Sequence, residues 1–459
     1  MIFLSALAAA WFLLVAALYL LPGTALRRAA GWFFPLAGWA AGIGCGAALA
    51  PWQRLIVASA AMLYLLKGSV LFRYPRDRIA AFPKTGLFVY LTLWPGIDAA
   101  PFERRVAAEL PEGESARFFQ GYRTMLGGLV LALLLALLEP ALPPAVVAWA
   151  GLLAILLAVH RGYAEILAYL MRAAGWPVAP LFDHPFRSAS LHDFWSRRWN
   201  LAFVQLGRIL LFPTLRRKLG AAGSIAAIFV LSGLLHESAL SYPAGGGWGG
   251  PFCYFVLQGI LVLAERGALR IEARWPAPAR RVWTWFWLLA PAPLLFHGPF
   301  MEALILPLYH HLHLALAARP VGWYLNLALW LATVGHLFAI AAGVQLPWRL
   351  QWKRDFAKLE PFNRKIFVTY YGTIGLTIVS FFLLTAVLHA EMLAGGKSAL
   401  ALTGFIAVFW TMRLTVDFFY FDHRDWPKGP QFVIGHTLLT SLFIAMAGTF
   451  WALVLRHLV

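Results

Sequence analysis

Charged side chains are scarce in this chain. Aspartate, glutamate, lysine and arginine make up 13% of its 459 residues, against about 25% in soluble domains. Cysteine is scarcer still, and Cys45 and Cys253 both lie within apolar segments, which argues against a disulfide-rich scaffold. No segment is long and polar enough to form a soluble nucleic-acid-binding face. The formal net charge of +18 therefore does not predict a nucleic acid partner.

Apolar residues dominate instead. They amount to 61% of the sequence, with a mean hydropathy of +0.71, which predicts an integral membrane protein. Because a helix needs about 20 apolar residues to cross a bilayer, the apolar runs predict an all-α, polytopic bundle of about 10–13 membrane helices, some of them interfacial or re-entrant. The runs are 2–21, 31–49, 54–72, 124–139, 144–171, 222–242, 251–265, 281–297, 300–317, 321–342, 367–390, 399–418 and 431–455.

The N-terminal run, 2–21, has no basic residue before it and no small-residue cleavage site, so we interpret it as a retained span. Basic residues gather in the loops, a pattern typical of the cytoplasmic loops of multi-pass membrane proteins. Membrane lipids are therefore expected partners around the spans. Three full spans between Arg281 and Ala342 would put the basic stretch 349–365 on the wrong side. One of the three is therefore predicted to be re-entrant or not to cross.

A change in composition predicts two domains, 1–342 and 343–459. The stretch 345–366 combines Trp348 and Trp352 with six basic residues, as an interfacial amphipathic helix does. The second domain has no motif that indicates its role. Arginine outnumbers lysine thirty to eight. That bias is typical of a GC-rich bacterial genome, and we expect the protein in a bacterial inner membrane.

His236 and Glu237 stand in the middle of an apolar run. Ionisable residues inside a span are costly, by roughly 2.5–3.5 kcal/mol each on insertion scales, and they usually face a cavity. Ser232 and Gly233 leave room beside His236, and a neutral imidazole is the natural base near neutral pH. The alternative is a buried histidine that hydrogen-bonds Glu237 or a backbone carbonyl and only joins two helices.

Two further segments carry polar residues. In 194–200, a helix would stack Trp195 on Trp199 and put Arg197 and Asn200 on one face. The paired arginines suit phosphate binding, although an ordinary interfacial helix would have the same composition. In 252–266, Gln258 and Glu265 lie two turns apart on one face, which either substrate contact or interhelical hydrogen bonding would explain.

Together the three segments resemble a known family. Ser190 through Asn200, then the Ser-Gly-Leu-Leu-His sequence ending at His236, then Gln258 through Glu265 are similar in order and spacing to the wax synthase branch of the membrane-bound O-acyltransferase superfamily. The resemblance covers residues 188–266. It implies that His236 is catalytic, with Asn200 as its partner. The substrate-binding set that we predict beside them is Trp195, Arg197, Arg198, Trp199, Ser232, Glu237 and Gln258.

The implied reaction moves a fatty acyl group from acyl-CoA to a lipidic alcohol. A thioester is already activated, so neither a metal nor a resident cofactor is expected. His236 would take the proton of the alcohol, and Asn200 would position a substrate or donate to the oxyanion. Arg197, Arg198 and also Arg208 would bind the phosphates of coenzyme A.

Two other functions fit parts of the sequence. A proton-coupled transporter could use the pair formed by His236 and Glu237, but transporters often have duplicated halves, and no repeat is evident. An acyltransferase of another branch could modify a glycan or a protein. A metal site formed by His310, His311, His313 and Glu302 is disfavoured, because only His310 and His313 share a helical face. Lys67 is expected to snorkel toward the membrane surface.

Overall fold

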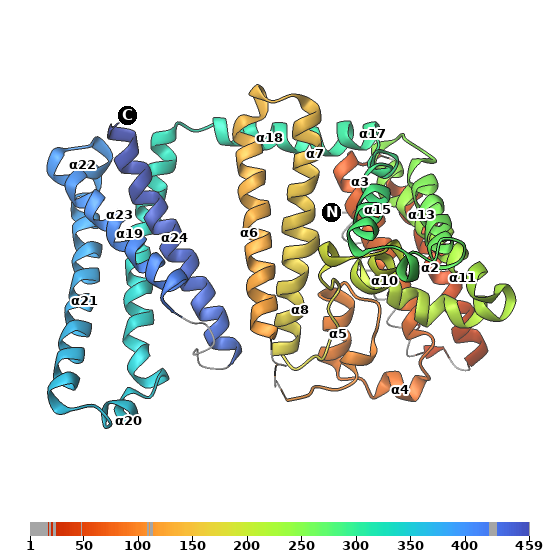
Figure 1. Ribbon diagram of the computed structural model, residues 1–459, viewed down its shortest axis with the longest axis horizontal. Coiled ribbons are helices and arrows are strands. Elements are labelled where there is room, and N and C mark those ends of the chain that lie inside the picture. Colours follow the sequence, from red (N-terminus) through yellow and green to blue (C-terminus); the bar gives the residue numbers. More distant parts are fainter. Residues whose placement is uncertain are drawn as a thin grey trace. The chain divides into compact units, whose positions relative to one another are not determined.

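The computed structural model describes residues 17, 20–21, 24–46, 48–107, 110, 113–421 and 429–458. The regular elements within these ranges are helices, with no strand among them (Figure 1). The prediction of an all-α membrane protein is therefore confirmed. Almost all of the first predicted span, 2–21, lies outside the described residues.

The chain divides into two compact units, Met1–His313 and Leu314–Val459. The boundary predicted at 342/343 falls inside one helix, α19 (Val321–Arg349). The basic stretch that suggested this boundary forms the end of α19, the short α20 (Trp352–Phe356) and the beginning of α21 (Pro361–Val387). Its composition therefore marks a turn between two membrane helices of the second unit.

Eight helices of the described chain are long and apolar enough to cross a membrane, or nine if one bent pair is counted as a span. This is fewer than the predicted count. The run 2–21 lies almost wholly outside the described residues, and the run at 31–49 falls largely in α2 (Thr24–Gly46), which is not among the eight. The run at 251–265 forms α13 (Gly250–Arg266), which at 17 residues is shorter than a full span. The predicted spans 281–297 and 300–317 are the two halves of the bent pair. The eight are Pro51–Leu71, Glu114–Ala141, Pro144–Ala173, Leu201–Ala244, Val321–Arg349, Pro361–Val387, Lys397–Phe419 and Pro430–Leu458.

The bent pair lies in the region where the basic residues predict one helix that is re-entrant or does not cross. The pair is bent by 68° between its halves, Ala277–Leu295 and Gly298–Ala317. Pro291, Pro293 and Pro299 surround the break, and proline removes a backbone donor and clashes with the preceding turn. The first half contains α15 (Ala277–Leu289) and α16 (Ala292–Leu295). The second contains α17 (Gly298–Phe300), the π-helical η8 (Met301–Ile305) and α18 (Leu306–Ala317).

Two long helical segments of the first unit pack closely through glycine. One is α6 (Glu114–Leu138). The other runs through α7 (Pro144–Ile155), the π-helical η3 (Leu156–Tyr163) and α8 (Ala164–Ala173). A Cβ at Gly162 would lie 2.5 Å from the backbone nitrogen of Met125, so no larger residue fits there. Small residues at such contacts let membrane helices approach closely.

Lys67 differs from its predicted role. It lies in α3 (Pro51–Leu71) and is 1% exposed, so it does not snorkel. Its Nζ donates hydrogen bonds to the carbonyl oxygens of Tyr90 and Trp94. These carbonyls lie near the end of α5 (Lys84–Thr92), where helical partners run out. The lysine therefore satisfies backbone groups that would otherwise stay unpaired in an apolar environment.

The described part of the second unit contains four long helices and two short ones that begin after its first residues. Besides α19, α20 and α21, it contains α22 (His389–Ala394), α23 (Lys397–Phe419) and α24 (Pro430–Leu458). Trp410 and Phe450 are buried in its apolar core. The remaining helices, all in the first unit, are α2 (Thr24–Gly46), α4 (Arg76–Ala80), α9 (Leu191–Asp193), α10 (Leu201–Leu206), α11 (Phe212–His236), α12 (Tyr242–Ala244) and α14 (Ile271–Arg274).

Candidate active site

A cavity of about 690 Å³ lies within the first unit. That volume is in the range of small-molecule binding sites, about 300–1,000 Å³. Residues from η3, from the segment 192–212, from α11, from α13 and from the bent pair line it, and most are aromatic or aliphatic. Of the residues predicted as site residues, the cavity brings together His236, Asn200, Ser232, Trp195, Trp199 and Arg208.

The geometry of His236 fixes its tautomer. The ring Nδ1 lies 2.7 Å from the backbone oxygen of Ser232. A carbonyl oxygen only accepts, so Nδ1 carries the hydrogen and Nε2 keeps its lone pair in the neutral ring. The ring also packs on Phe255, with centroids 4.2 Å apart. Because Nδ1 is bonded and one face of the ring is packed, Nε2 of His236 is left to accept a proton from a substrate.

Asn200 occupies a backbone position that suits its residue type. Its φ of 44° and ψ of 60° are left-handed, a conformation that asparagine tolerates better than most residues. The residue stands directly before α10. Its neighbours are tied to the preceding loop, because Leu201 donates to the carbonyl of Leu181 and Asp183 donates to that of Arg198, both at 2.9 Å. These bonds present Asn200 to the cavity from a fixed turn.

The helix predicted over 194–200 is only partly formed. A π-helical segment, η5 (Phe194–Arg198), ends before Trp199, which is extended with φ −107° and ψ 131°. The expectation that Arg197 and Asn200 share a helical face is therefore wrong. Phe194 stands between the two tryptophans: it stacks on Trp199 and meets Trp195 edge-on.

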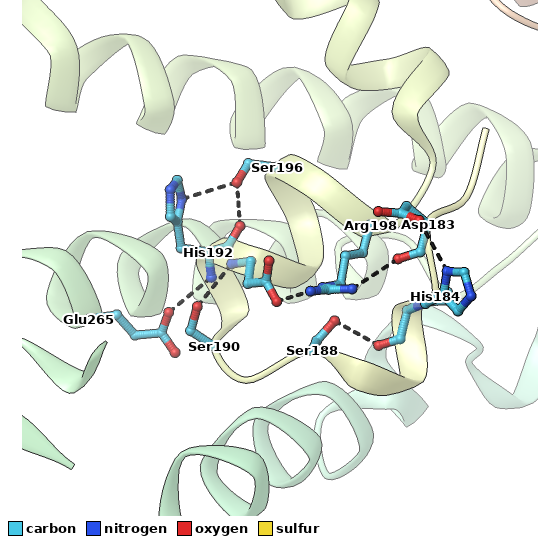
Figure 2. A network of polar contacts seen from close by, with 10 residues as sticks. Asp183, His184, Ser188, Ser190, His192, Ser196, Arg198 and Glu265 are labelled. Carbon is cyan, nitrogen blue, oxygen red and sulfur yellow. Dashed lines mark hydrogen bonds and ion pairs between the residues drawn. The ribbon is translucent and has the colours of Figure 1, made fainter. Parts of the chain in front are cut away.

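The structure does not bring Arg197 and Arg198 to the cavity. Arg198 Nε lies 2.6 Å from Asp193 Oδ2, and Arg198 Nη1 donates to the backbone oxygen of Asp183 at 3.3 Å (Figure 2). Arg197 is exposed. Neither is among the described residues that line the cavity. Through these contacts Arg198 fixes the loop that precedes Asn200.

Asp183 belongs to the same anchoring network, in the loop between two spans. Arg117 Nη2 lies 2.8 Å from its carboxylate, and His184 Nδ1 lies 3.1 Å from the same oxygen. Burial alone would raise the pKa of Asp183, but the hydrogen bond from His184 and the charge of Arg117 outweigh it and lower that pKa below its ordinary value. The carboxylate is thus held ionised as an anchor.

Glu265 forms hydrogen bonds to the beginning of the segment Ser190 through Asn200. Its two oxygens accept the backbone N–H groups of Leu191 and His192 at 2.9 Å each, and Figure 2 shows the bond to His192. Trp283 Nε1 also donates to Glu265 at 2.9 Å. The side chain is 3% exposed. A carboxylate that accepts several hydrogen bonds in a buried site fixes the residues that donate them. Glu265 therefore positions the segment that carries Asn200.

Gln258 and Glu237 also lie outside the described cavity lining. Gln258 accepts from Trp195 Nε1 at 3.0 Å and donates to the backbone oxygen of Trp287 at 2.6 Å. Glu237 Oε1 accepts the N–H groups of Gly249 and Phe252. These groups open α13, where helical N–H groups lack partners. Both side chains were predicted to bind substrate, and their contacts are those of positioning residues.

Sequence reasoning missed His160, Arg161 and Arg266, which all line the cavity. His160 packs against Trp199, with ring centroids 5.5 Å apart, so its helix lies beside the turn at Asn200. The signal was available: His160 and Arg161 stand inside the apolar run 144–171, as His236 does in its own run. The rule that ionisable residues inside spans have a role applies equally to them.

The three histidines considered for a metal site, His310, His311 and His313, each contact another protein group. His310 Nδ1 lies 3.3 Å from Glu139, and His313 Nδ1 lies 3.0 Å from the backbone oxygen of Ala136. His311 Nδ1 lies 2.6 Å from the backbone oxygen of Pro307. Within the described ranges no three histidine, cysteine or acidic residues gather around one point.

A basic pocket adjoins the cavity. It has a volume of about 500 Å³ and is lined by Arg208, Phe212, Pro213, Arg216 and Arg217. Arg208 and Phe212 line the cavity as well. The two spaces therefore share a wall, and the arginines of the pocket stand beside the cavity.

Comparison with known proteins places the similarity in this part of the chain. The sequence model of the membrane bound O-acyl transferase family matches residues 176–257. The probable long-chain-alcohol O-fatty-acyltransferase 7 of Arabidopsis thaliana is 32% identical over 155 residues, which is 29% of this chain and 45% of the relative. The probable long-chain-alcohol O-fatty-acyltransferase 1 of that plant is 34% identical over 169 residues, 33% of this chain and 48% of the relative.

A third relative is the long-chain-alcohol O-fatty-acyltransferase of Simmondsia chinensis, 33% identical over 109 residues, or 21% of this chain and 31% of the relative. The chain thus spans about half the length, or less, of the curated relatives that it matches. The family match includes Asn200, His236 and Phe255. These comparisons confirm that the chain resembles the wax synthase branch of the membrane-bound O-acyltransferase superfamily.

Proposed function

We propose that this protein is a membrane-bound O-acyltransferase that moves a fatty acyl group from acyl-CoA to the hydroxyl of a lipidic alcohol. The observation that carries the proposal is His236 in a largely apolar cavity, with Nδ1 bonded to a carbonyl and Nε2 left to accept a proton. The names of the relatives, which act on long-chain alcohols, support the reaction class.

The proposed mechanism has two steps. The hydroxyl oxygen of the alcohol attacks the thioester carbonyl carbon while its proton passes to His236 Nε2, and the carbonyl electrons move to the oxygen. Asn200 donates a hydrogen bond to that oxyanion. The intermediate then re-forms the C=O bond and expels the thiolate of coenzyme A, which takes the proton back from the imidazolium. The products are an ester and free coenzyme A, and the base is regenerated.

The charge around the cavity supports a polyanionic donor. Arg161, Arg208 and Arg266 line the cavity, and no aspartate or glutamate is among the described lining residues. Arg216 and Arg217 extend the positive charge into the adjoining pocket. Arginine binds phosphate with several donors at once. Acyl-CoA fits these requirements, and the reaction needs no resident cofactor or metal.

The apolar wall supports a lipidic acceptor. Leu153, Leu156 and Ile228 are typical of the lining, which offers few polar groups to bind a sugar or a peptide. An acyl chain and a long-chain alcohol both gain free energy by leaving water for such a surface. Their reacting ends would then meet at His236 and Asn200.

We further propose a bacterial inner membrane as the location. The helices support a multi-pass integral membrane protein, and the excess of arginine over lysine is the basis for a bacterial origin. Immunoblotting of inner and outer membrane fractions from a source strain would test the location.

The function is tested by incubating purified protein in detergent or nanodiscs with radiolabelled acyl-CoA and separate acceptors: a long-chain primary alcohol, a sterol, diacylglycerol and a soluble sugar. We expect labelled ester with the long-chain alcohol and none with the sugar. A His236→Ala variant controls for contaminating enzymes. No transfer to any lipidic alcohol, or equal transfer by the variant, would refute the proposal.

A further inference from the structure

The cavity has a buried cation without a partner. Arg161 lies in η3, within the span Pro144–Ala173, and is 4% exposed. Its Nη1 is buried and makes no hydrogen bond to any residue that the structure describes. The residue borders the cavity that also contains His236 and Asn200. A guanidinium stays charged in proteins. The carboxylates of Glu165 and Asp183 act on this charge from a distance, but neither forms a hydrogen bond or an ion pair with Arg161.

Another arginine of the same helical segment has a carboxylate beside it that balances its charge. Arg172, in α8, is also largely buried, and its Nε donates to Glu114 Oε2 at 2.7 Å. The fold therefore provides a carboxylate for Arg172 from the neighbouring helix α6. Arg161 forms no ion pair within 4 Å with a described residue, although Glu165 and Asp183 act on its charge from further away. The difference between two arginines on one helix calls for a reason specific to Arg161.

Glu165 is the nearest candidate along the helix, one turn after Arg161. It is 6% exposed, and its Oε2 is also buried and without a hydrogen-bond partner among the described residues. The two side chains thus lie one turn apart without closing an ion pair. An intrahelical pair would satisfy both groups, so its absence leaves Arg161 available to an anion that enters from the cavity.

The other charged residues that line the cavity favour such an anion. The other charged residues among its described lining, Arg208 and Arg266, are positive. The adjoining pocket adds two more arginines. Low-dielectric walls lined by charge of one sign concentrate ligands of the opposite sign. Of the substrates in the proposed reaction, only the coenzyme A thioester carries anionic groups, namely its phosphates.

We propose that Arg161 binds a phosphate group of the acyl donor inside the cavity. The inference rests on the proposed function and adds a specific residue to it: Arg161, and not Arg197 or Arg198, anchors the donor. Arg208, Arg216 and Arg217 would then face the more exposed part of the nucleotide. The contact is made by the bound donor throughout the reaction, so it acts on KM and leaves kcat largely unchanged.

The test compares acyl donors that carry successively fewer phosphate groups, the smallest of which also lacks the nucleotide. Arg161→Gln, Arg161→Lys and the wild type are assayed with acyl-CoA, with acyl-dephospho-CoA and with the phosphate-free N-acetylcysteamine thioester of the same acyl chain. We expect Arg161→Gln to raise the KM for acyl-CoA at least tenfold and to leave kcat/KM for the phosphate-free thioester within twofold of wild type. Arg161→Lys should recover part of the loss. Arg104→Gln, in an exposed loop, serves as the matched control.

The phosphate-free donor also reports whether the variant is folded. If Arg161→Gln loses kcat/KM equally with all donors, Arg161 has a structural role and the inference is overturned. The same holds if the KM for acyl-CoA does not change. Should the wild type transfer nothing from any donor, the proposed function fails, and titration of unacylated coenzyme A into both proteins still tests the inference: equal Kd values would overturn it.

Discussion

One buried charged residue in each unit shows how differently such residues can be partnered. In the second unit, Asp417 is 1% exposed and is surrounded by donors: Thr440 Oγ1 at 2.9 Å, Arg413 Nη1 at 3.3 Å and His436 Nε2 at 3.5 Å. In the first unit, Arg161 Nη1 is buried beside a cavity and has no hydrogen-bond partner among the residues that the structure describes. A buried charge with protein partners holds helices together, whereas one without partners beside a cavity indicates a ligand.

The same contrast applies to histidines. In the second unit, His389 Nε2 lies 2.7 Å from Asn326 Oδ1 and its ring stacks on Trp330 at 4.1 Å, so the residue joins α22 to α19. In the first unit, His236 is held through Nδ1 by its own helix and lines the cavity. Each histidine has one ring nitrogen bonded to the protein, and the Nδ1 of His389 is buried without a hydrogen-bond partner among the described residues. The difference is that only His236 lines the cavity, which sequence position alone does not reveal.

The largest expected effect follows the removal of His236. His236→Ala should lower acyl transfer by about 10²–10⁴-fold, because the general base is lost. Little packing changes, so the melting temperature in detergent should stay close to that of wild type. His389→Ala in the second unit is the matched control and should retain turnover. Full activity of His236→Ala would end its assignment as the base, and loss of folding along with activity would return it to a structural role.

Asn200 should give the second largest effect. Asn200→Gly preserves the left-handed backbone, since glycine adopts positive φ without strain. Transfer should nevertheless fall by about 10²–10³-fold, the usual cost of losing one oxyanion donor. Asn200→Ala adds backbone strain and should also lower the melting temperature. If Asn200→Gly retains normal kcat, the residue was selected only for its backbone conformation.

Glu265 tests whether a positioning residue has a smaller effect than the groups it positions. Glu265→Gln replaces one acceptor oxygen by an NH2 group that faces a backbone N–H, which should cost roughly 1.5–3 kcal/mol of stability. Transfer should fall by no more than about 10²-fold through misplacement of the Asn200 turn. The KM values for both substrates should rise together. A change confined to one substrate would instead indicate direct contact with it.

Asp417 should affect stability and leave catalysis unchanged. Asp417→Ala removes the acceptor of the Thr440 hydroxyl and the counter-charge of Arg413, at a cost of roughly 1–3 kcal/mol. Folded protein should keep the kcat and KM values of wild type. The measurements are detergent melting and steady-state transfer on the same sample. Altered acyl transfer at full stability would give the second unit a part in the reaction.

The sequence predicted helices, spans and the motif residues well because these depend on local signals. Apolar length identified the membrane helices, and the Ser-Gly-Leu-Leu-His motif identified His236. Contacts between distant segments could not be read in that way. The bond between Glu265 and His192 joins residues 73 positions apart, and the link from Arg198 to Asp183 requires a loop to fold back. Arg161 was missed because its run was treated only as a span.

The smallest expected effect separates two neighbouring arginines. Arg197 is exposed and makes no ion pair with the residues described, while Arg198 pairs with Asp193 at 2.6 Å. Arg197→Gln should therefore leave stability and the KM for acyl-CoA within twofold of wild type, since a solvated arginine outside the cavity has no contact to lose. Arg198→Gln should lower the melting temperature by releasing the loop at Asp183. A donor-specific rise in KM for Arg197→Gln would restore this residue to phosphate binding and remove the exclusive role given to Arg161.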